Sequence, residues 1–352
     1  MRSTKSSAGD HQVMEIPMKV WRTLLIIVVA VVLLSTGATT ALGDDAPPAS
    51  PTPVPPSAAE ASSSAPAAPS TTATRPHQQD AAAVGKALSN PMSDVWALFT
   101  EFDFAFNEGD IPGGDGKVTY QTIFETVMPI KLTKNWKLIT RPTIPIVWST
   151  PLPKLDLTPV PNIDWGTKTG LADMKLPTLL APNAGLKLGP GQLGGAIGPT
   201  WGIPTSTDDA LGSQKWEIGV GGILSYKTKK ITVGIFPQYW WSVGNRKHGK
   251  SRPKTSHGNL IYFFYYELGN AWQIGINPTI AYNHEAPSKN RWNVPVGLTV
   301  AKTWKFGKMP IKFQLGGEYS VVNEDLYGKR WLIKLNIIPV IPDLIKKPLF
   351  GS

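Results

Sequence analysis

The stretch QKWEIGVGGILSYKTKKITVGIFPQYWWSV, from Gln214 to Val243, decides the fold. Bulky apolar side chains recur at every second position on both sides of a lysine-rich turn at 228–230. Small and polar residues occupy most of the positions between them. Because the side chains of a strand point alternately to its two faces, a period of two predicts a hairpin with one apolar face. Ile223 and Phe236 break this alternation.

A hairpin of this kind suits two classes of protein. A soluble sandwich buries the apolar face of each sheet against a second sheet. A membrane barrel presents that face to lipid and keeps its polar face inside. The rest of the chain has to distinguish the two.

Further alternating runs begin at Asn90 and continue almost to the end of the chain. Together with the hairpin they predict about twelve strands, which is an even number. The runs are 96–107, 118–130, 136–148, 168–181, 192–204, 214–227, 231–243, 256–268, 271–282, 291–304, 309–321 and 329–340.

The connections between these runs sort by length. Short turns alternate along the chain with longer polar segments, and the Pro-rich segment 149–167 is interpreted as the longest loop. An outer-membrane barrel has short periplasmic turns and long outer loops, whereas a sandwich gives no reason for such sorting. We therefore predict an all-β protein, an antiparallel up-and-down transmembrane β-barrel.

Aromatic residues gather near the predicted strand ends, where the two interfacial girdles of a barrel lie. They include Trp96, Trp136, Trp148, Trp216, Trp241, Trp272, Trp292, Trp304 and Trp331. Prolines inside the runs remove hydrogen-bond donors from the sheet, so bulges or strand ends are expected at Pro142, Pro145, Pro199, Pro237 and Pro295.

The composition agrees with a strand-rich membrane protein. Of the 352 residues 17% are charged, below the roughly 25% that is usual in soluble domains, and glycine and proline number 33 each. The absence of cysteine excludes disulfides, thiol catalysis and cysteine-ligated metals. A net charge of +10 suggests phosphate-bearing neighbours and is silent about the fold.

The N-terminal part of the chain predicts export. Residues 1–43 are interpreted as a signal peptide with an upstream extension, because basic residues precede an apolar run, Leu24 to Leu34, too short to span a membrane. Residues 44–89 are rich in Pro, Ala and Ser and are predicted to be a disordered linker. Within it, 76–89 are weakly helical, and a plug or cap is the alternative to a frayed linker there. The barrel domain is then 90–352.

Several segments resemble a bacterial outer-membrane family. They include SNPMSDVWALFTEFDFAF (89–106), VMPIKLTKNWKLITRPTIPIV (127–147), GPTWGIPTSTDDALGSQKWEIGVG (198–221) and KFGKMPIKFQLGGEYSV (305–321). The family is often mislabelled "neuromedin U" and is grouped with the phenol-degradation meta-pathway (MetA-like) barrels. The resemblance covers about 89–340 and implies an outer-membrane transporter or channel, but it identifies no catalytic residues. Such barrels often end on an aromatic residue, whereas here Phe350 is followed by Gly351 and Ser352.

The alternation also predicts which polar side chains point into the lumen of the barrel. A path lined by mixed charge could pass a solute, and the same groups could instead fill the lumen as ion pairs. The lumen-lining candidates are Glu101, Asp103, Glu125, Arg141, Asp173, Lys175, Glu217, Gln238, Gln273, Asn277, Lys312, Gln314, Glu318, Lys334 and Asn336.

Motifs for catalysis are not found in the sequence. It has no nucleotide-binding motif, no metal-ligand spacing and no nucleophile elbow, so we predict no cofactor and no enzyme. His257 or His284 could act as a base in an outer-membrane hydrolase, which remains an alternative. Asp208 and Asp209 could bind a cation in an outer loop. A secreted soluble β-sandwich that binds a ligand is a second alternative.

The expected environment is the outer membrane of a Gram-negative bacterium. Outer-membrane lipid is the expected partner, and the basic segment Gly244 to Thr255 would meet lipopolysaccharide phosphates. That segment lacks the interleaved aromatic residues of single-strand nucleic-acid sites, so no nucleic-acid binding is expected. The predicted function is a channel or transporter for small solutes, hydrophobic or aromatic ones by resemblance.

Overall fold

The computed structural model describes residues 76–156, 162–246, 252–345 and 347–350. The predicted signal peptide and residues 44–75 of the predicted linker lie outside these ranges. So do Lys247, His248 and Lys250 of the basic segment. In the described part of the chain, no helix is long and apolar enough to cross a membrane.

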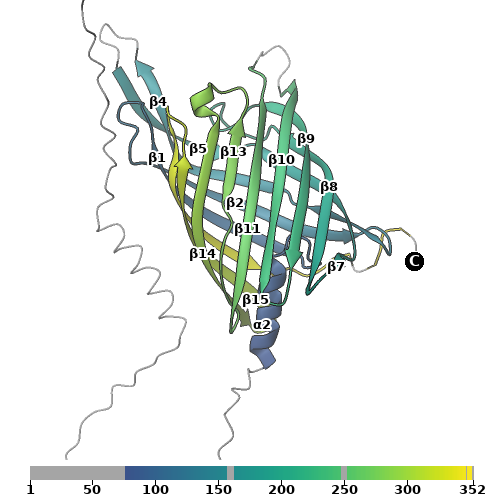
Figure 1. Cartoon of the computed structure of the whole chain (residues 1–352). Helices are drawn as coiled ribbons and strands as arrows, with labels where there is room; N and C mark the ends of the chain where they lie inside the picture. Colours follow the sequence, from purple (N-terminus) through teal and green to yellow (C-terminus); the bar gives the residue numbers. More distant parts are fainter. Residues whose placement is uncertain (1–75, 157–161, 247–251, 346, 351–352) are drawn as a thin grey trace, which may run out of the picture. The chain divides into compact units, whose positions relative to one another are not determined.

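Strands dominate the described residues and form a single antiparallel sheet (Figure 1). Its members are β1 (Ala97–Glu108), β2 (Lys117–Lys131), β3 (Trp136–Thr140), β4 (Thr143–Asp156), β5 (Asn162–Leu171), β6 (Met174–Pro182), β7 (Leu186–Leu188), β8 (Gly191–Ile203), β9 (Lys215–Lys227), β10 (Ile231–Asn245), β11 (Ser256–Gly269), β12 (Trp272–Ile276), β13 (Thr279–Asn283), β14 (Trp292–Phe306), β15 (Met309–Val322) and β16 (Gly328–Pro339). The described helices are α2 (Pro76–Leu88) and one 3-10 turn, η1 (Ser288–Asn290).

The sheet closes on itself. β1 pairs with β16 in a register that runs from Thr100 opposite Ile337 to Glu108 opposite Gly328. The segment pairs β3 and β4, β5 and β6, and β12 and β13 each occupy one position in the ring, and β7 is a short arm on β8. Twelve ring positions remain. The predicted twelve-stranded barrel is confirmed, and the open sandwich is wrong because β1 and β16 are bonded to each other.

The two faces of the wall differ as the alternation predicts. On β9, Trp216, Val220 and Leu224 are 50%, 45% and 50% exposed on the outer surface. Ile223 and Phe236, which break the alternation, are buried inside the barrel at 4% and 2% exposure. The outer surface is thus a continuous apolar belt, and the lumen contains apolar side chains of its own.

The connections separate the two ends of the barrel. The turn end has the connections 132–135, 183–190, 228–230, 270–271 and 307–308, and the loop end has the longer ones. The interpretation of 149–167 as a loop is wrong over most of its length. β4 continues to Asp156 and pairs with β5 from Asn162. Pro151 and Pro153 are tolerated there because this extension of β4 lacks a described strand on its other side.

The expectation for the prolines holds at two of the five positions. Pro142 separates β3 from β4, and Pro295 lies at a register shift against β15. The expectation is wrong for Pro145, Pro199 and Pro237, which lie inside strands. At Pro237 the pairing with β11 is continuous while the pairing with β9 skips Phe236 and Pro237, so the missing N–H faces the β9 side.

The predicted linker ends earlier than residue 89. Residues Pro76 to Leu88 form α2, which contacts β14 and β15. The alanine-rich run at 81–83 favours a helix, and Pro91 disfavours helical geometry at Asn90, so the helix ends there. Leu88 packs with Ala97 and Ile338 of the barrel wall. Burial of this apolar face stabilises a segment that composition alone would leave unfolded.

The C-terminal segment leaves the barrel at the turn end. β16 ends at Pro339, and the backbone N–H of Ile341 then donates to the carbonyl of Trp96. Further on, the N–H groups of Leu349 and Phe350 donate to Lys131 and Leu132 at the β2–β3 turn. The last residues therefore cross the turn end instead of completing a strand.

The assignment of faces can be tested by charge. Val220→Arg places a guanidinium on the outer surface near the middle of β9, and we expect a loss of roughly 2–4 kcal/mol in the free energy of unfolding in vesicles. Asn259→Arg, at nearly the same level on the inner face of β11, should cost clearly less. Urea unfolding of both variants in the same vesicles measures the difference. Equal costs would contradict a lipid-facing Val220.

Candidate solute pathway

Most of the predicted lumen-lining residues border a cavity or are buried in the barrel. Glu101, Glu125, Arg141, Asn277, Lys312, Gln314, Lys334 and Asn336 border one cavity. Asp103, Glu217, Gln238, Gln273 and Glu318 are almost completely buried. Asp173 and Lys175 lie nearer the loop end. Asp173 accepts hydrogen bonds from the backbone of Ser206 and Ser213, so it holds the 204–214 loop and does not face the cavity.

The segment that follows α2 enters the lumen from the turn end. We call residues 76–95 the plug. Lys137 Nζ on β3 donates to the carbonyl of Met92 at 2.8 Å and to Asp94 Oδ1 at 2.6 Å. Ser225 Oγ on β9 donates to Asn90 Oδ1 at 3.2 Å. The plug is therefore bonded to two separate strands of the wall, β3 and β9, and lies inside the lumen at this end.

A second group of contacts fixes the junction between α2 and the lumen. Lys312 Nζ on β15 donates to Ser89 Oγ at 2.6 Å, and Ser89 Oγ lies 3.0 Å from Gln273 Oε1 on β12. Lys86 Nζ on α2 reaches the carbonyls of Thr228 and Lys229. Partial burial lowers the pKa of the Lys86 ammonium. All of these contacts are non-covalent, so the plug is able to dissociate from the barrel wall.

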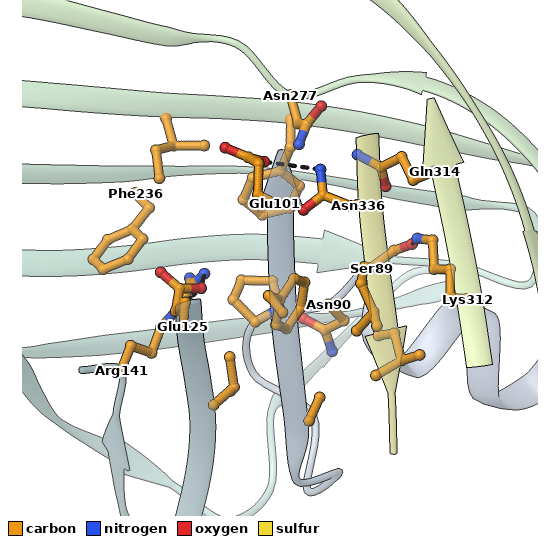
Figure 2. A pocket seen from close by; sticks show the side chains of 18 of the residues that line it. Ser89, Asn90, Glu101, Glu125, Arg141, Phe236, Asn277, Lys312, Gln314 and Asn336 are labelled. Carbon is orange, nitrogen blue, oxygen red and sulfur yellow. Dashed lines mark hydrogen bonds and ion pairs between the residues drawn. The ribbon is translucent and has the colours of Figure 1, made fainter. Parts of the chain in front are cut away.

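Between the plug and the wall lies a cavity of about 170 Å³ (Figure 2). Its floor is formed by plug residues such as Ser89 and Asn90. Figure 2 shows Glu125 beside Arg141, with which it forms an ion pair, and Asn336 bonded to Glu101 Oε2 at 2.8 Å. These polar groups satisfy one another, and so the cavity presents hydrogen-bonding groups whose charges are largely paired.

The opposite side of the cavity is apolar. Phe236, Ile261 and Phe263 border it from β10 and β11. Phe236 belongs to an apolar cluster with Met92 of the plug and with Ile139 and Leu179 of the wall. The guanidinium of Arg141 lies 5.1 Å from the centre of the Phe236 ring. The cavity is consequently amphipathic, with aromatic side chains on β10 and β11 and most of its charged groups on the strands across from them.

On the loop-end side of the cavity, a buried charge cluster lies on the inner face of the wall. Lys334 forms an ion pair with Glu318, whose side chain is 5% exposed, and it donates to the carbonyl of Asn277 at 3.1 Å. Asp103, opposite Lys334 on β1, accepts a hydrogen bond from Gln121 at 2.9 Å. Charges of both signs therefore share the middle of the barrel, which is the ion-filled arrangement that the sequence allows as one alternative.

Near the loop end, Glu217 collects several partners. Lys175 forms an ion pair with it, Thr255 Oγ1 donates to Oε1 at 2.6 Å, and His257 Nε2 lies 3.2 Å from the same oxygen. The His257 ring stacks on Trp240 at 5.3 Å. His284 lies 3.2 Å from the Tyr282 hydroxyl. Among the described residues, no hydrogen bond joins either imidazole ring to a serine hydroxyl, which is the pair that a Ser-His hydrolase uses.

The two loop carboxylates considered for a cation are bound to side-chain cations instead. Asp208 forms an ion pair with Lys168 and Asp209 with Arg252, each at 2.6 Å. The hydrogen bond from Lys168 holds the pKa of Asp208 below its usual value. Within the described ranges, no group of three or more His, Asp or Glu side chains could hold a metal ion.

Sequence reasoning missed several residues that border the cavity. Ser89 lies in the segment interpreted as linker and Asn90 at the very start of the predicted barrel, and Phe236, Ile261 and Phe263 are apolar residues in a lumen expected to be polar. The break in alternation at Ile223 and Phe236 was the available signal. An apolar side chain at an inward position indicates an apolar neighbour inside the barrel, and here that neighbour includes Met92.

No protein-family model and no curated protein matches this sequence. Solved structures with a similar shape include an outer-membrane channel from Pseudomonas putida F1, at 15% identity and a TM-score of 0.48, covering 70% of this chain and 94% of that one. The Pseudomonas putida toluene transporter TodX follows at 8% identity and a TM-score of 0.36, covering 72% and 92%. Outer-membrane phospholipase A from Escherichia coli has 12% identity and a TM-score of 0.36, and the match covers 76% of this chain and 99% of that one. The barrel assignment rests on the strand pairing described above.

Proposed function

We propose that this protein is a channel or transporter of the Gram-negative outer membrane that passes small hydrophobic or aromatic solutes. The observation that carries the proposal is the amphipathic cavity inside a closed barrel, with a non-covalent plug as its floor. An apolar belt on a ring without free edges suits lipid, because backbone groups in hydrocarbon need partners within the sheet. The turn end would face the periplasm and the loop end the cell exterior.

The cavity supports one class of solute over others. Its volume of about 170 Å³ is comparable to the roughly 150 Å³ cavity that holds benzene in an engineered protein core. Phe236 and Phe263 offer ring faces for an aromatic solute, and Asn336 and Gln314 offer hydrogen bonds to a polar substituent. The resemblance to the phenol-degradation (MetA-like) barrels points to the same class.

Two further expectations belong to this proposal. Lipopolysaccharide is the partner that we expect for exposed cations at the loop end, of which Lys254 is one. The His257–Glu217 pair is the feature that a hydrolase would use. If the protein is a channel, His257→Ala should leave solute uptake intact. A loss of lipid or ester hydrolysis in that variant would support the enzyme instead.

A substitution that fills the cavity tests the proposed pathway. Ile261→Trp points into the cavity, and we expect uptake of a phenol by proteoliposomes to fall about tenfold, because the indole occupies the space the solute needs. The matched control is Leu260→Trp, the preceding residue on the same strand, which faces outward. Uptake is followed with radiolabelled phenol. Equal uptake by both variants and the unchanged protein would contradict passage through this cavity.

A further inference from the structure

Lysines recur around the whole turn end of the barrel. Each of its connections carries at least one, or is reached by one, in the part of the chain that the structure describes. The residues are Lys131 and Lys134 at the β2–β3 turn, Lys187 on β7, Lys227, Lys229 and Lys230 at the β9–β10 turn, Lys302, which reaches Asn270, Lys305 and Lys308 at the β14–β15 turn, and Lys347 in the C-terminal segment. We call this set the lysine rim.

Negative charge at the same end is scarce. The described carboxylates there are Asp94, Glu267 and Asp343, and Asp94 is already paired with Lys137. Lys131, Lys134, Lys229 and Lys308 are exposed and form no ion pair with any described carboxylate. These four like charges repel one another, so they favour an anionic neighbour.

The loop end is organised in the opposite way. Four of its cations form pairs within the protein, Lys168–Asp208, Arg252–Asp209, Lys289–Asp325 and Arg330–Glu108. Further exposed carboxylates, Asp110, Asp115, Asp164 and Glu285, lie at the same end as its other lysines. Carboxylates thus accompany the cations at the loop end and are scarce at the turn end.

The position of the lysine rim relative to the exposed aromatic residues of the outer wall indicates which anionic neighbour it meets. Lys134 lies two residues from Trp136, and Lys308 two residues from Phe306, both of which are exposed on the outer wall at 46% and 55%. Lys302 Nζ lies 4.9 Å from the ring centre of Trp272. Aromatic side chains of a barrel lie at the headgroup level, and lysines just beyond them reach the phosphates.

The distribution around the perimeter favours lipid over a soluble partner. A protein would need one contiguous patch on one side, whereas lysines at every turn of a ring match an annulus of headgroups. We propose that the lysine rim binds the anionic phospholipids of the periplasmic leaflet, with phosphatidylglycerol as the headgroup class. This inference uses only the orientation in the proposed function, and it does not depend on the solute.

The test uses the full chain in vesicles of phosphatidylethanolamine with spin-labelled phosphatidylglycerol or phosphatidylcholine as the probe. The measured quantity is the ratio of the two association constants at the barrel surface. A lysine near an anionic surface is worth about 1 kcal/mol, which is roughly fivefold. We expect the unchanged protein to prefer phosphatidylglycerol by about that factor.

Two variants with the same loss of charge locate the preference. Gln at Lys131, Lys134, Lys229 and Lys308 removes the exposed part of the lysine rim, and the preference should fall to near parity. Gln at Lys117, Lys154, Lys168 and Lys289 removes four lysines from the loop end and should leave the preference unchanged. A heat-modifiability gel shift shows that both variants are folded.

A measurement on the unchanged protein tests the proposal without any variant. At about 1 M NaCl the screening length falls to about 3 Å, and the preference should disappear. The proposal is overturned if the unchanged protein shows no preference, if the rim variant keeps it, or if the loop-end variant loses it. It is also overturned if millimolar inorganic phosphate, at constant ionic strength, abolishes the preference, or if soluble polyglutamate binds where phosphatidylglycerol does not.

Discussion

Deleting residues 76–93 should raise the mean ionic current of the barrel in planar bilayers by about 30- to 100-fold. The plug is held by Lys137, Lys312 and Ser225, and by apolar contacts of Met92 and Leu88. If these contacts leave the seated state favoured by roughly 2–3 kcal/mol, about one molecule in a hundred is open at any time. Removing the plug removes that equilibrium.

A disulfide between the plug and the wall can hold the plug in its bound position. A Cβ built on Gly194 lies 3.5 Å from Met92 Cβ, within the range that disulfides require. The sequence has no cysteine of its own, so Met92→Cys with Gly194→Cys gives a single possible bridge. The oxidised protein should carry less current than the unchanged protein, and reduction should restore it. An unchanged current in both the deletion and the oxidised bridge would show that conduction does not depend on the plug.

Lys334→Met should cost about 3–5 kcal/mol in the free energy of unfolding, because it leaves buried carboxylates without their cation. The Lys334 and Glu318 side chains are 7% and 5% exposed, and Asp103, opposite Lys334, is 4% exposed. A buried charge without a partner is far more costly than an exposed one. Urea unfolding in vesicles measures the loss.

Two controls separate charge from packing. Lys334→Arg keeps the charge and should retain most of the stability. Lys334→Met combined with Glu318→Leu removes both members of the pair and should recover part of the loss, since an apolar pair can replace a buried ion pair. A double variant less stable than Lys334→Met alone would contradict the role of the pair.

The period-two pattern was sufficient to predict the barrel because each wall strand has one face toward lipid and one toward the lumen. It could not predict the extension of β4 and β5, since Pro151 and Pro153 normally argue against strands. It placed Glu101, Asn336 and their neighbours inside from parity alone. Whether those groups would be open to solute or paired with each other depends on contacts between distant strands, such as Asn336 with Glu101.

For a related reason, the sequence left residues 76–89 undecided between a frayed linker and a plug. They contain few large apolar side chains, and composition favours the unfolded class for such a segment. What stabilises it is supplied by other strands: Lys137 from β3, Ser225 from β9 and Lys312 from β15. A local reading of the sequence contains none of these partners.

The bond from Ile341 to Trp96 has a consequence for how the molecule is assembled. Trp96 directly follows the plug, and the described residues after Ile341 run on to the β2–β3 turn, so both segments lie at one mouth of the cylinder. β1 and β16 can join only when the final strand is in place, and the described tail can cross the mouth only after that. Closure of the barrel and the seating of both segments are therefore coupled at the same end.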